Sequence, residues 1–291
     1  MNKKVGFYSL LLSGLIFGTF PMLIRFITSS FGTFTQISLR TAIAAVIVGA
    51  ILFRNKTSLN VRHIHPIALL LFFLAFPLDV IFYTFAIVTG KATNALFLLF
   101  AVSLLFSLIT GTLFFKEKIS YQKIIAVVLL LIGLVCFTHP FDSLGLTMAT
   151  IFGLLAGFFD ALTNLLRKHI GVADRWVTLF YQYLTMGVLT FLLGNFSGEI
   201  MIKNISIIPI AIIVIYGILN VSTGSLLAIG FSNFDFNLGT VVLASELFFG
   251  AIFNTIFLHE VPTTIEAVGG LIIFAAVLAA NLTFAPRESR A

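Results

Sequence analysis

The chain has 291 residues, of which 59% are hydrophobic and only 10% are charged, and its mean hydropathy is +1.13. A water-soluble globular domain carries about 25% charged residues, so this composition excludes an ordinary soluble domain and favours a membrane protein. The net charge is +6, but the basic residues form no dense patch with interleaved aromatic residues, which argues against a nucleic-acid partner. A single cysteine, Cys136, excludes an intramolecular disulfide framework.

Ten runs of about 20 mostly apolar residues follow one another along the chain, and each is long enough to cross a bilayer core about 30 Å thick as a helix. Their approximate ranges are 5–27, 34–53, 65–88, 92–115, 121–139, 144–168, 176–196, 207–230, 236–258 and 263–284. The runs lack the strict apolar and polar alternation of barrel strands and are about twice as long. The sequence therefore predicts an all-α membrane protein with ten transmembrane helices.

The first run follows Lys3 and Lys4 and so resembles the start of a signal peptide. No small-x-small cleavage site closes this run, and nine further runs follow it. We therefore expect a permanent first helix.

Lys and Arg residues indicate the orientation. With the amino terminus inside, thirteen of them fall on inner segments, against three on outer segments, while Arg40 lies within a span. The outer three are Arg25, Lys91 and Lys203. The positive-inside rule predicts a multi-pass protein of the inner (cytoplasmic) membrane with both termini cytoplasmic.

An offset of 143 residues aligns the two halves of the chain without gaps. The informative identities at this offset are Asn94/Asn237, Glu117/Glu260 and Gly14/Gly157. Each half holds five spans, an odd number, so the halves cross the membrane in opposite directions. The sequence predicts two inverted five-helix repeats, at 1–141 and 142–291.

The segments 103–117 (SLLFSLITGTLFFKE) and 246–260 (ELFFGAIFNTIFLHE), with the five-plus-five organisation, resemble the drug/metabolite transporter superfamily in its EamA-type branch. The resemblance covers almost the whole chain. It implies a central cavity lined by the first four helices of each repeat, with the fifth helices at the periphery. It also implies movement of small metabolites, often amino acids and frequently as export. Leu104 and Leu247 stand where many members have proline, so the resemblance carries no helix break to these positions.

Four ionisable residues lie deep within spans, namely Arg40, Asp79, Asp160 and Glu246. A charge at the bilayer centre costs roughly 2.5 to 3.5 kcal/mol on insertion scales, so these side chains must face the protein interior or water. Arg40 either pairs with Asp79 or clamps a substrate carboxylate, with Gln36 one turn away. Three acids against one base leave at least one acid to carry a proton or to meet a substrate ammonium, which motivates the hypothesis of proton coupling.

Helical spacing places small and polar residues on the same faces as these acids. The three stripes are Gly153, Gly157, Asp160 and Asn164; Gly239, Glu246, Gly250 and Asn254; and Ser103, Ser107 and Gly111. Small residues allow close helix approach, as we also expect of Gly14 and Gly18.

Pro77 lies two residues before Asp79, and Tyr83 lies one turn beyond that acid. At the 143-residue offset Pro77 aligns with Asn220, which opens the polar run 220–225. Interrupted helices at corresponding places in two halves indicate a transport site. The alternative is that the Ser, Thr and Gly residues of this run pack helices and bond to their own backbone.

The expected substrate-binding residues are Arg40, Asp79, Tyr83, Ser103, Asp160, Asn164, Asn220 and Glu246. No catalytic, cofactor or metal site is expected, since the five histidines lie at loops or boundaries without metal-site spacing. Glu117 and Glu260 lie at span ends, where an acid is favoured as a helix cap.

The leading functional prediction is a secondary transporter that exports a small metabolite by alternating access. An amino acid or related solute comes first, because Arg40 and the acids could receive the two ends of a zwitterion. The expected partners are this solute, the lipid bilayer and a coupling proton or cation. No Walker motif is present, so energy would come from gradients. The oligomeric state stays open.

Other functions remain as alternatives. One is an uptake or exchange carrier for a nucleoside-like or cationic metabolite, and another is a passive channel. A remote alternative is an intramembrane aspartyl protease that uses Asp79 and Asp160. The segments GFFD and PLD around these acids lack the Tyr-Asp and Gly-x-Gly-Asp elements of such proteases.

Overall fold

The computed structural model describes residues 2–61, 64–90, 92–117, 120–138, 148–171, 175–204, 206–258 and 263–282. These residues form α-helices, short connections and one isolated bridge between Phe31 and Ile202. The helices in chain order are α1 (Lys3–Phe17), α2 (Phe20–Thr28), α3 (Thr33–Arg54), α4 (Pro66–Thr89), α5 (Ala92–Phe115), α6 (Tyr121–Thr138), α7 (Met148–Ile170), α8 (Arg175–Phe196), α9 (Ile207–Asn233), α10 (Phe236–Leu243), α11 (Ser245–Leu258) and α12 (Thr264–Leu282).

Eight helical segments of the described residues are long and apolar enough to cross a membrane. Two of the eight consist of paired helices, α1 with α2 and α10 with α11. Two shorter apolar segments, Ile124–Cys136 in α6 and Ala267–Ala279 in α12, fall at the fifth and tenth predicted spans. The predicted all-α membrane fold is confirmed.

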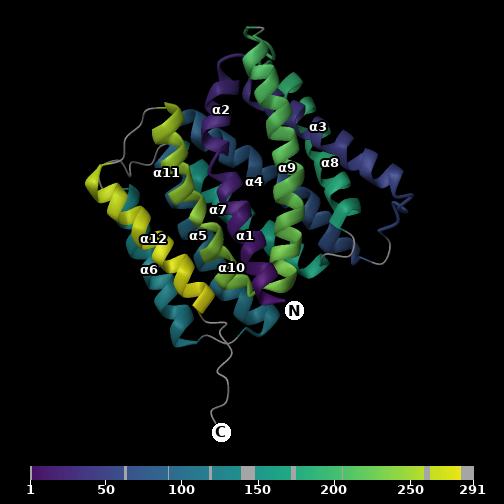
Figure 1. Ribbon diagram of the computed structural model, residues 1–291. Helices are drawn as coiled ribbons and strands as arrows, with labels where there is room; N and C mark the ends of the chain where they lie inside the picture. The colour runs from purple at the N-terminus through teal and green to yellow at the C-terminus, as the bar shows by residue number, and fades with distance from the viewer. Residues whose placement is uncertain are drawn as a thin grey trace.

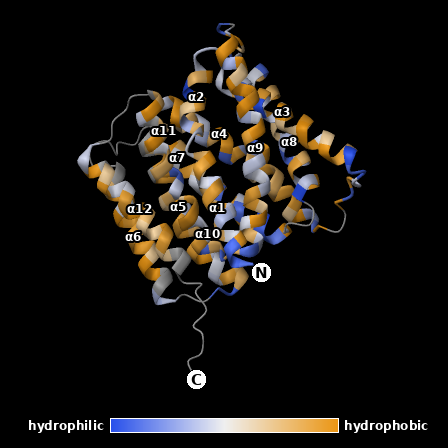
Figure 2. Cartoon of the chain, viewed as in Figure 1, coloured by the Kyte–Doolittle hydropathy of each residue, from blue (hydrophilic) through white to orange (hydrophobic). Residues whose placement is uncertain are grey.

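The outer faces of the helices are apolar. Val46 on α3 is 72% exposed and Leu113 on α5 is 70% exposed. Figure 2 shows hydrophobic residues along most of the helices, with hydrophilic residues gathered near helix ends. So much exposed apolar surface would be a liability in water but suits contact with lipid tails.

Helices of the first half pack chiefly on helices of the second half. α4 packs against α7, and α9 packs against α1, so the third span of each half packs against the first span of the other half. α3 packs against α8, and α6 against α12; Figure 1 shows these two pairs at opposite edges. Such exchanged partners are what a two-fold relation between the halves produces. The arrangement also leaves α6 and α12 at the periphery.

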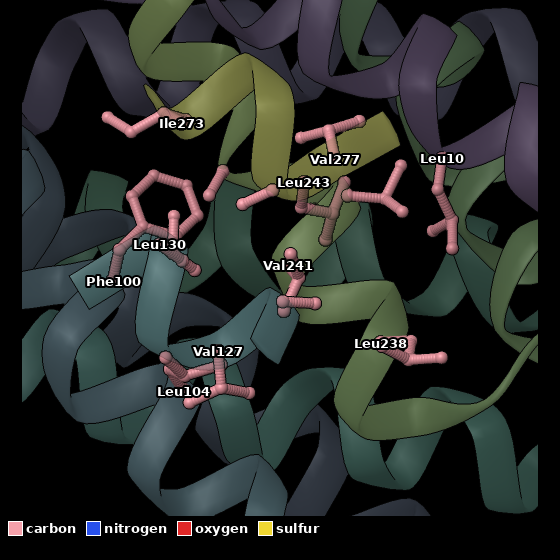
Figure 3. Packing of buried hydrophobic residues seen from close by; sticks show 14 of the residues in the cluster. Leu10, Phe100, Leu104, Val127, Leu130, Leu238, Val241, Leu243, Ile273 and Val277 are labelled. Atoms are coloured by element: carbon pink, nitrogen blue, oxygen red, sulfur yellow. The ribbon is translucent and has the colours of Figure 1, made fainter. Parts of the chain in front are cut away.

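The largest buried apolar cluster joins α5 and α10 to the peripheral pair α6 and α12. Leu104, Leu130, Val241 and Val277 are each completely buried within it, as Figure 3 shows from close by. Because lipid tails are as apolar as these side chains, their close packing, rather than removal from water, holds the helices together. Phe100 belongs to this cluster and also lines the central cavity described below, so the core forms one wall of that cavity.

The expected helix interruptions at Pro77 and at 220–225 are wrong. α4 is continuous through Pro77, and α9 is continuous through the polar run. Proline removes one backbone donor, but the remaining hydrogen bonds of α4 and its packing against α7 and α8 maintain the helix.

The interruptions lie in the first and ninth spans instead. The chain turns at Gly18 and Thr19, where the Thr19 hydroxyl donates to the Ile16 carbonyl at 2.7 Å. The second turn is at Ala244, whose carbonyl accepts from the Leu247 N–H at 3.1 Å. This second turn comes two residues before Glu246, so it sets the position of that acid.

Two glycines of the first span allow the chain there to approach α10 and α11 closely, as predicted. A Cβ atom at Gly14 would lie 3.3 Å from the Leu243 carbonyl oxygen and from the Glu246 nitrogen. At Gly18 it would lie 2.8 Å from the Gly250 nitrogen. These are backbone atoms, which cannot rotate away as a side chain can. Glycine is therefore required where the first span passes the turn at Ala244.

We predict that Gly18→Ala lowers the thermal denaturation midpoint in detergent, because overpacking of this kind typically costs about 1 to 3 kcal/mol. Gly187→Ala is the matched control, since its Cβ would meet Thr41 Oγ1 at an ordinary 3.4 Å. Alanine is the better helix former, so the control protein should be as stable as the parent or slightly more stable. Equal midpoints for both variants would contradict the close approach of the first span to α11.

Candidate functional site

A cavity lies between the two halves, and side chains from α1, α2, α4, α5, α7, α8, α9, α10 and α11 line it. Its volume is about 90 Å³. A single water requires about 10 to 15 Å³, so the cavity has room for several waters or for part of a small solute. α3 contributes no lining residue, whereas the family resemblance implied that the first four helices of each repeat would contribute.

Three acids from three helices face this cavity: Asp79 of α4, Asp160 of α7 and Glu246 of α11. Among the residues that the structure describes, none of the three forms an ion pair with an Arg or Lys side chain. They also form no cluster with the geometry of a metal site in that part of the chain. The acids are therefore distributed around the cavity rather than locked in salt bridges.

Hydrogen-bond donors serve two of the acids. Asp160 accepts from the Ser103 hydroxyl at 2.7 Å and from the Asn164 amide at 2.8 Å. Glu246 accepts from the Tyr83 hydroxyl at 3.2 Å. Asp79 has no hydrogen-bond partner within the described ranges, and its side chain is half-buried at the cavity wall. Its carboxyl group is therefore the one best placed to meet a ligand.

Arg40 lies outside the cavity lining. Its Nη2 donates to Thr84 Oγ1 at 2.9 Å, and its guanidinium lies over the Tyr216 ring, 4.2 Å from the centroid. Tyr216 lines the cavity, so Arg40 stands behind it. The alternative of a pair with Asp79 is not found, and the Gln36 amide donates to Thr28 Oγ1 at 3.1 Å rather than assisting Arg40. Arg40 instead joins α3 to α4 and α9.

Arg167 reaches the cavity, although its place near the end of the sixth predicted span indicated a charge on an inner segment. It is only 5% exposed, and its Nη1 donates to Asn164 Oδ1. Asn164 in turn donates to Asp160, so Ser103, Asp160, Asn164 and Arg167 form one hydrogen-bonded series, here called the α7 chain. Arg167 follows Asn164 by three residues, so extending the polar stripe of α7 by one turn would have found it.

The polar run of α9 lines the cavity and also forms hydrogen bonds within its own helix. Asn220 and Thr223 line the cavity, and the Asn220 carbonyl accepts from the Tyr183 hydroxyl. The Ser222 and Thr223 hydroxyls bond to the backbone of their own helix, at Ile218 and Leu219. The cluster therefore packs helices and also supplies polar surface to the cavity.

Aromatic side chains complete much of the lining. They are Phe17, Phe20, Phe76, Tyr83, Phe100, Tyr183 and Tyr216. Such rings offer apolar contact together with electron-rich faces that attract cations.

Glu117 caps a helix, as expected of its position, but the helix belongs to the other half. Its carboxylate accepts from the Phe236 and Asn237 backbone nitrogens at the start of α10, the second at 3.3 Å. Lys168 Nζ pairs with the same carboxylate at 2.8 Å. The start of α10 is thereby fixed to α7 and to the end of α5. The related Glu260 lies outside the described residues, as does the side chain of Asn254.

The sequence model of the EamA-like transporter family matches residues 4–138 and matches again at residues 147–282. The chain belongs to this family. Two successive matches also confirm the internal repeat. Members of the EamA-like family are membrane transporters of small solutes and not enzymes. This chain is therefore a membrane transporter of a small solute.

Comparisons with solved structures agree on the fold. Twenty-nine solved chains match. One of them, a crystal structure described only as that of a protein, has a TM-score of 0.79 at 15% identity over 97% of each chain. At this identity the likeness shows the fold alone. None of the curated proteins matches.

We predict that Asn164→Leu destabilises this EamA-like protein by about 1 to 3 kcal/mol, because the buried Arg167 and the half-buried Asp160 each lose a hydrogen-bond partner. Thermal denaturation in detergent measures the loss. Asn195→Leu is the control: Asn195 is exposed and bonds to the Phe191 carbonyl of its own helix, so the change should stay within about 0.5 kcal/mol. Equal stability of the two variants would contradict a stabilising role for the hydrogen bonds of Asn164 in the α7 chain.

Proposed function

We propose that this EamA-like transporter carries a small amine-bearing solute, an amino acid or related compound, across the cytoplasmic membrane by alternating access. We further propose that it works in the direction of export and exchanges the solute for protons. The observation that carries the proposal is that Asp79, Asp160 and Glu246 face one cavity without a salt bridge among the described residues.

Burial without an ion pair limits what these acids can do. A carboxylate within the membrane that meets neither water nor a cation bears a large desolvation cost. Each acid must therefore carry a proton, accept enough hydrogen bonds, or receive a cation. Asp160 and Glu246 receive donors, whereas Asp79 receives none in the described residues. An ammonium group or a proton at Asp79 satisfies this requirement.

The lining also suits the rest of such a solute. Phe76 and Tyr83 lie one turn on either side of Asp79 along α4, and all three line the cavity. An ammonium held at Asp79 would have an apolar surface beside it and an aromatic face in reach. The same features support the second candidate, a cationic metabolite, which needs no partner for a carboxylate. Membership of a transporter family argues against the protease alternative.

We predict that Asp79→Asn reduces solute counterflow in proteoliposomes at least 10-fold, because it removes the negative charge that receives the ammonium while preserving shape. Glu246→Gln and Asp160→Asn should lose the dependence of transport on an imposed pH gradient. Tracer exchange across a panel of amino acids and amines at several external pH values measures both effects.

Glu199→Gln is the matched control for these acids. Glu199 accepts from the Phe34 and Thr35 backbone nitrogens at 3.0 Å each and so caps α3 outside the cavity. Its loss should lower thermal stability without changing the solute preference or the pH response. Unaltered counterflow in Asp79→Asn would overturn the ammonium site, and an unaltered pH response in both other variants would overturn proton exchange.

A further inference from the structure

A second, smaller pocket adjoins the central cavity at the end where Arg167 lies. Its volume is about 10 Å³, enough for one water or for one or two atoms of a ligand. Arg167, Gln182 and Gly224 line both spaces and so form the partition between them. Arg175 and Thr178 of α8 line the far side. The solute cavity and this pocket are therefore separated by polar side chains rather than by the apolar core.

Four polar atoms of Arg167, Gln182 and Arg175, which line the small pocket, have no hydrogen-bond partner among the described residues. In the described part of the chain, Arg167 Nε, Arg175 Nε and both polar atoms of the Gln182 amide are buried and make no hydrogen bond. Gln182 is completely buried and Arg167 is 5% exposed, so surface water does not serve these atoms. Buried polar groups are normally paired, so these atoms call for a water or a bound group in the adjoining space.

The chemistry of these atoms selects the kind of group. Two guanidinium groups and an amide present hydrogen-bond donors, and the guanidinium fork matches a carboxylate. The described residues that line the small pocket include two arginines and no acid. On the cavity side, Arg167 is already linked through Asn164 to Asp160, which holds its Nη1 and leaves its Nε without a partner. The described lining of this site suits an anionic group, because its charged side chains are both guanidinium groups.

The acids of the cavity lie beside the same arginine. Asp79, Asp160 and Arg167 line the same cavity, and Asp160 is linked to Arg167 through Asn164. A solute with a positive and a negative group can therefore place one at Asp79 and the other at Arg167. In this arrangement Arg167 takes the role that the sequence had indicated for Arg40.

We infer that Arg167 and Gln182, with Arg175 behind them, form a subsite that binds the carboxylate of the transported solute. The inference rests on the proposed function, because it assigns the second end of a solute whose ammonium is bound at Asp79. It makes Arg167 and Gln182 the residues that distinguish amino acids from simple amines.

The test uses leucine, leucinamide, N-acetylleucine and acetate as probes of the full-length protein in detergent. Thermal shifts measured over a concentration series give the affinity of each. We expect leucine to bind at least 10-fold more tightly than leucinamide. Arg167→Gln and Gln182→Met should each reduce that ratio towards one, because each weakens leucine binding more than leucinamide binding. Arg54→Gln, at the exposed end of α3, is the control and should keep the full ratio.

The outcomes separate this inference from the proposed function. If leucinamide and leucine bind equally to the parent protein, or if neither variant changes their ratio, the carboxylate subsite is wrong and the ammonium site stands. If acetate alone stabilises the parent and Arg167→Gln removes that effect while leucine and leucinamide stay equal, the subsite binds a free anion and the inference is overturned. If neither leucine nor leucinamide binds but N-acetylleucine does, the ammonium site fails.

Arg167→Gln also disturbs the α7 chain and could fail to fold. Gln182→Met keeps that chain intact and removes two buried polar atoms without partners, so it carries the test if the arginine variant is lost. Counterflow of labelled leucine against each probe in proteoliposomes should reproduce the order of the affinities.

Discussion

A carboxylate inside a membrane-spanning bundle needs a proton, hydrogen-bond donors or a cation, because an uncompensated charge there costs at least about 2.5 to 3.5 kcal/mol. Three acids in this chain meet the requirement differently. Asp160 accepts hydrogen bonds from Ser103 and Asn164, and Glu246 accepts one from Tyr83. Asp79 accepts none from the described residues. The cavity between the halves meets this requirement, because water or a solute there can supply the hydrogen-bond donor or the cation that Asp79 lacks.

The two halves exchange helix partners around the cavity, an arrangement consistent with the proposed alternating access. The third helix span of each half packs against the first span of the other half. The peripheral pair α6 and α12 packs on the apolar core and not on the cavity. The first span bends at Gly18, which lies close to the backbone of Gly250, and the ninth span bends at Ala244, close to Gly14. In transporters of this kind, alternating access is largely a rocking of one repeat against the other around a fixed site. Close contacts between bent spans are suited to such movement.

The sequence was sufficient for the spans and for the deep acids, because apolar runs of membrane length, with isolated charges inside them, are rare outside membrane-spanning helices. It was insufficient where tertiary contacts decide. Arg40 looked like a substrate clamp but is turned towards Thr84 and Tyr216. Arg167 looked like a loop charge beside Lys168, yet helix α7 continues far enough to bury it. The turn at Ala244 lies where Gly14 of another span comes close, a long-range contact that the local sequence does not indicate.

Transport through this site requires that water reach the acid-bearing cavity between the halves. Single cysteines in a Cys136→Ser background test it most directly, with Asn220→Cys in the cavity wall and Val46→Cys on the exposed apolar face of α3. A membrane-impermeant cationic methanethiosulfonate reagent reacts with the thiolate, which requires water. We predict that Asn220→Cys in native membranes is labelled from one side and protected by a transported solute, while Val46→Cys reacts far more slowly. An Asn220→Cys protein that resists labelling from both sides would contradict the account.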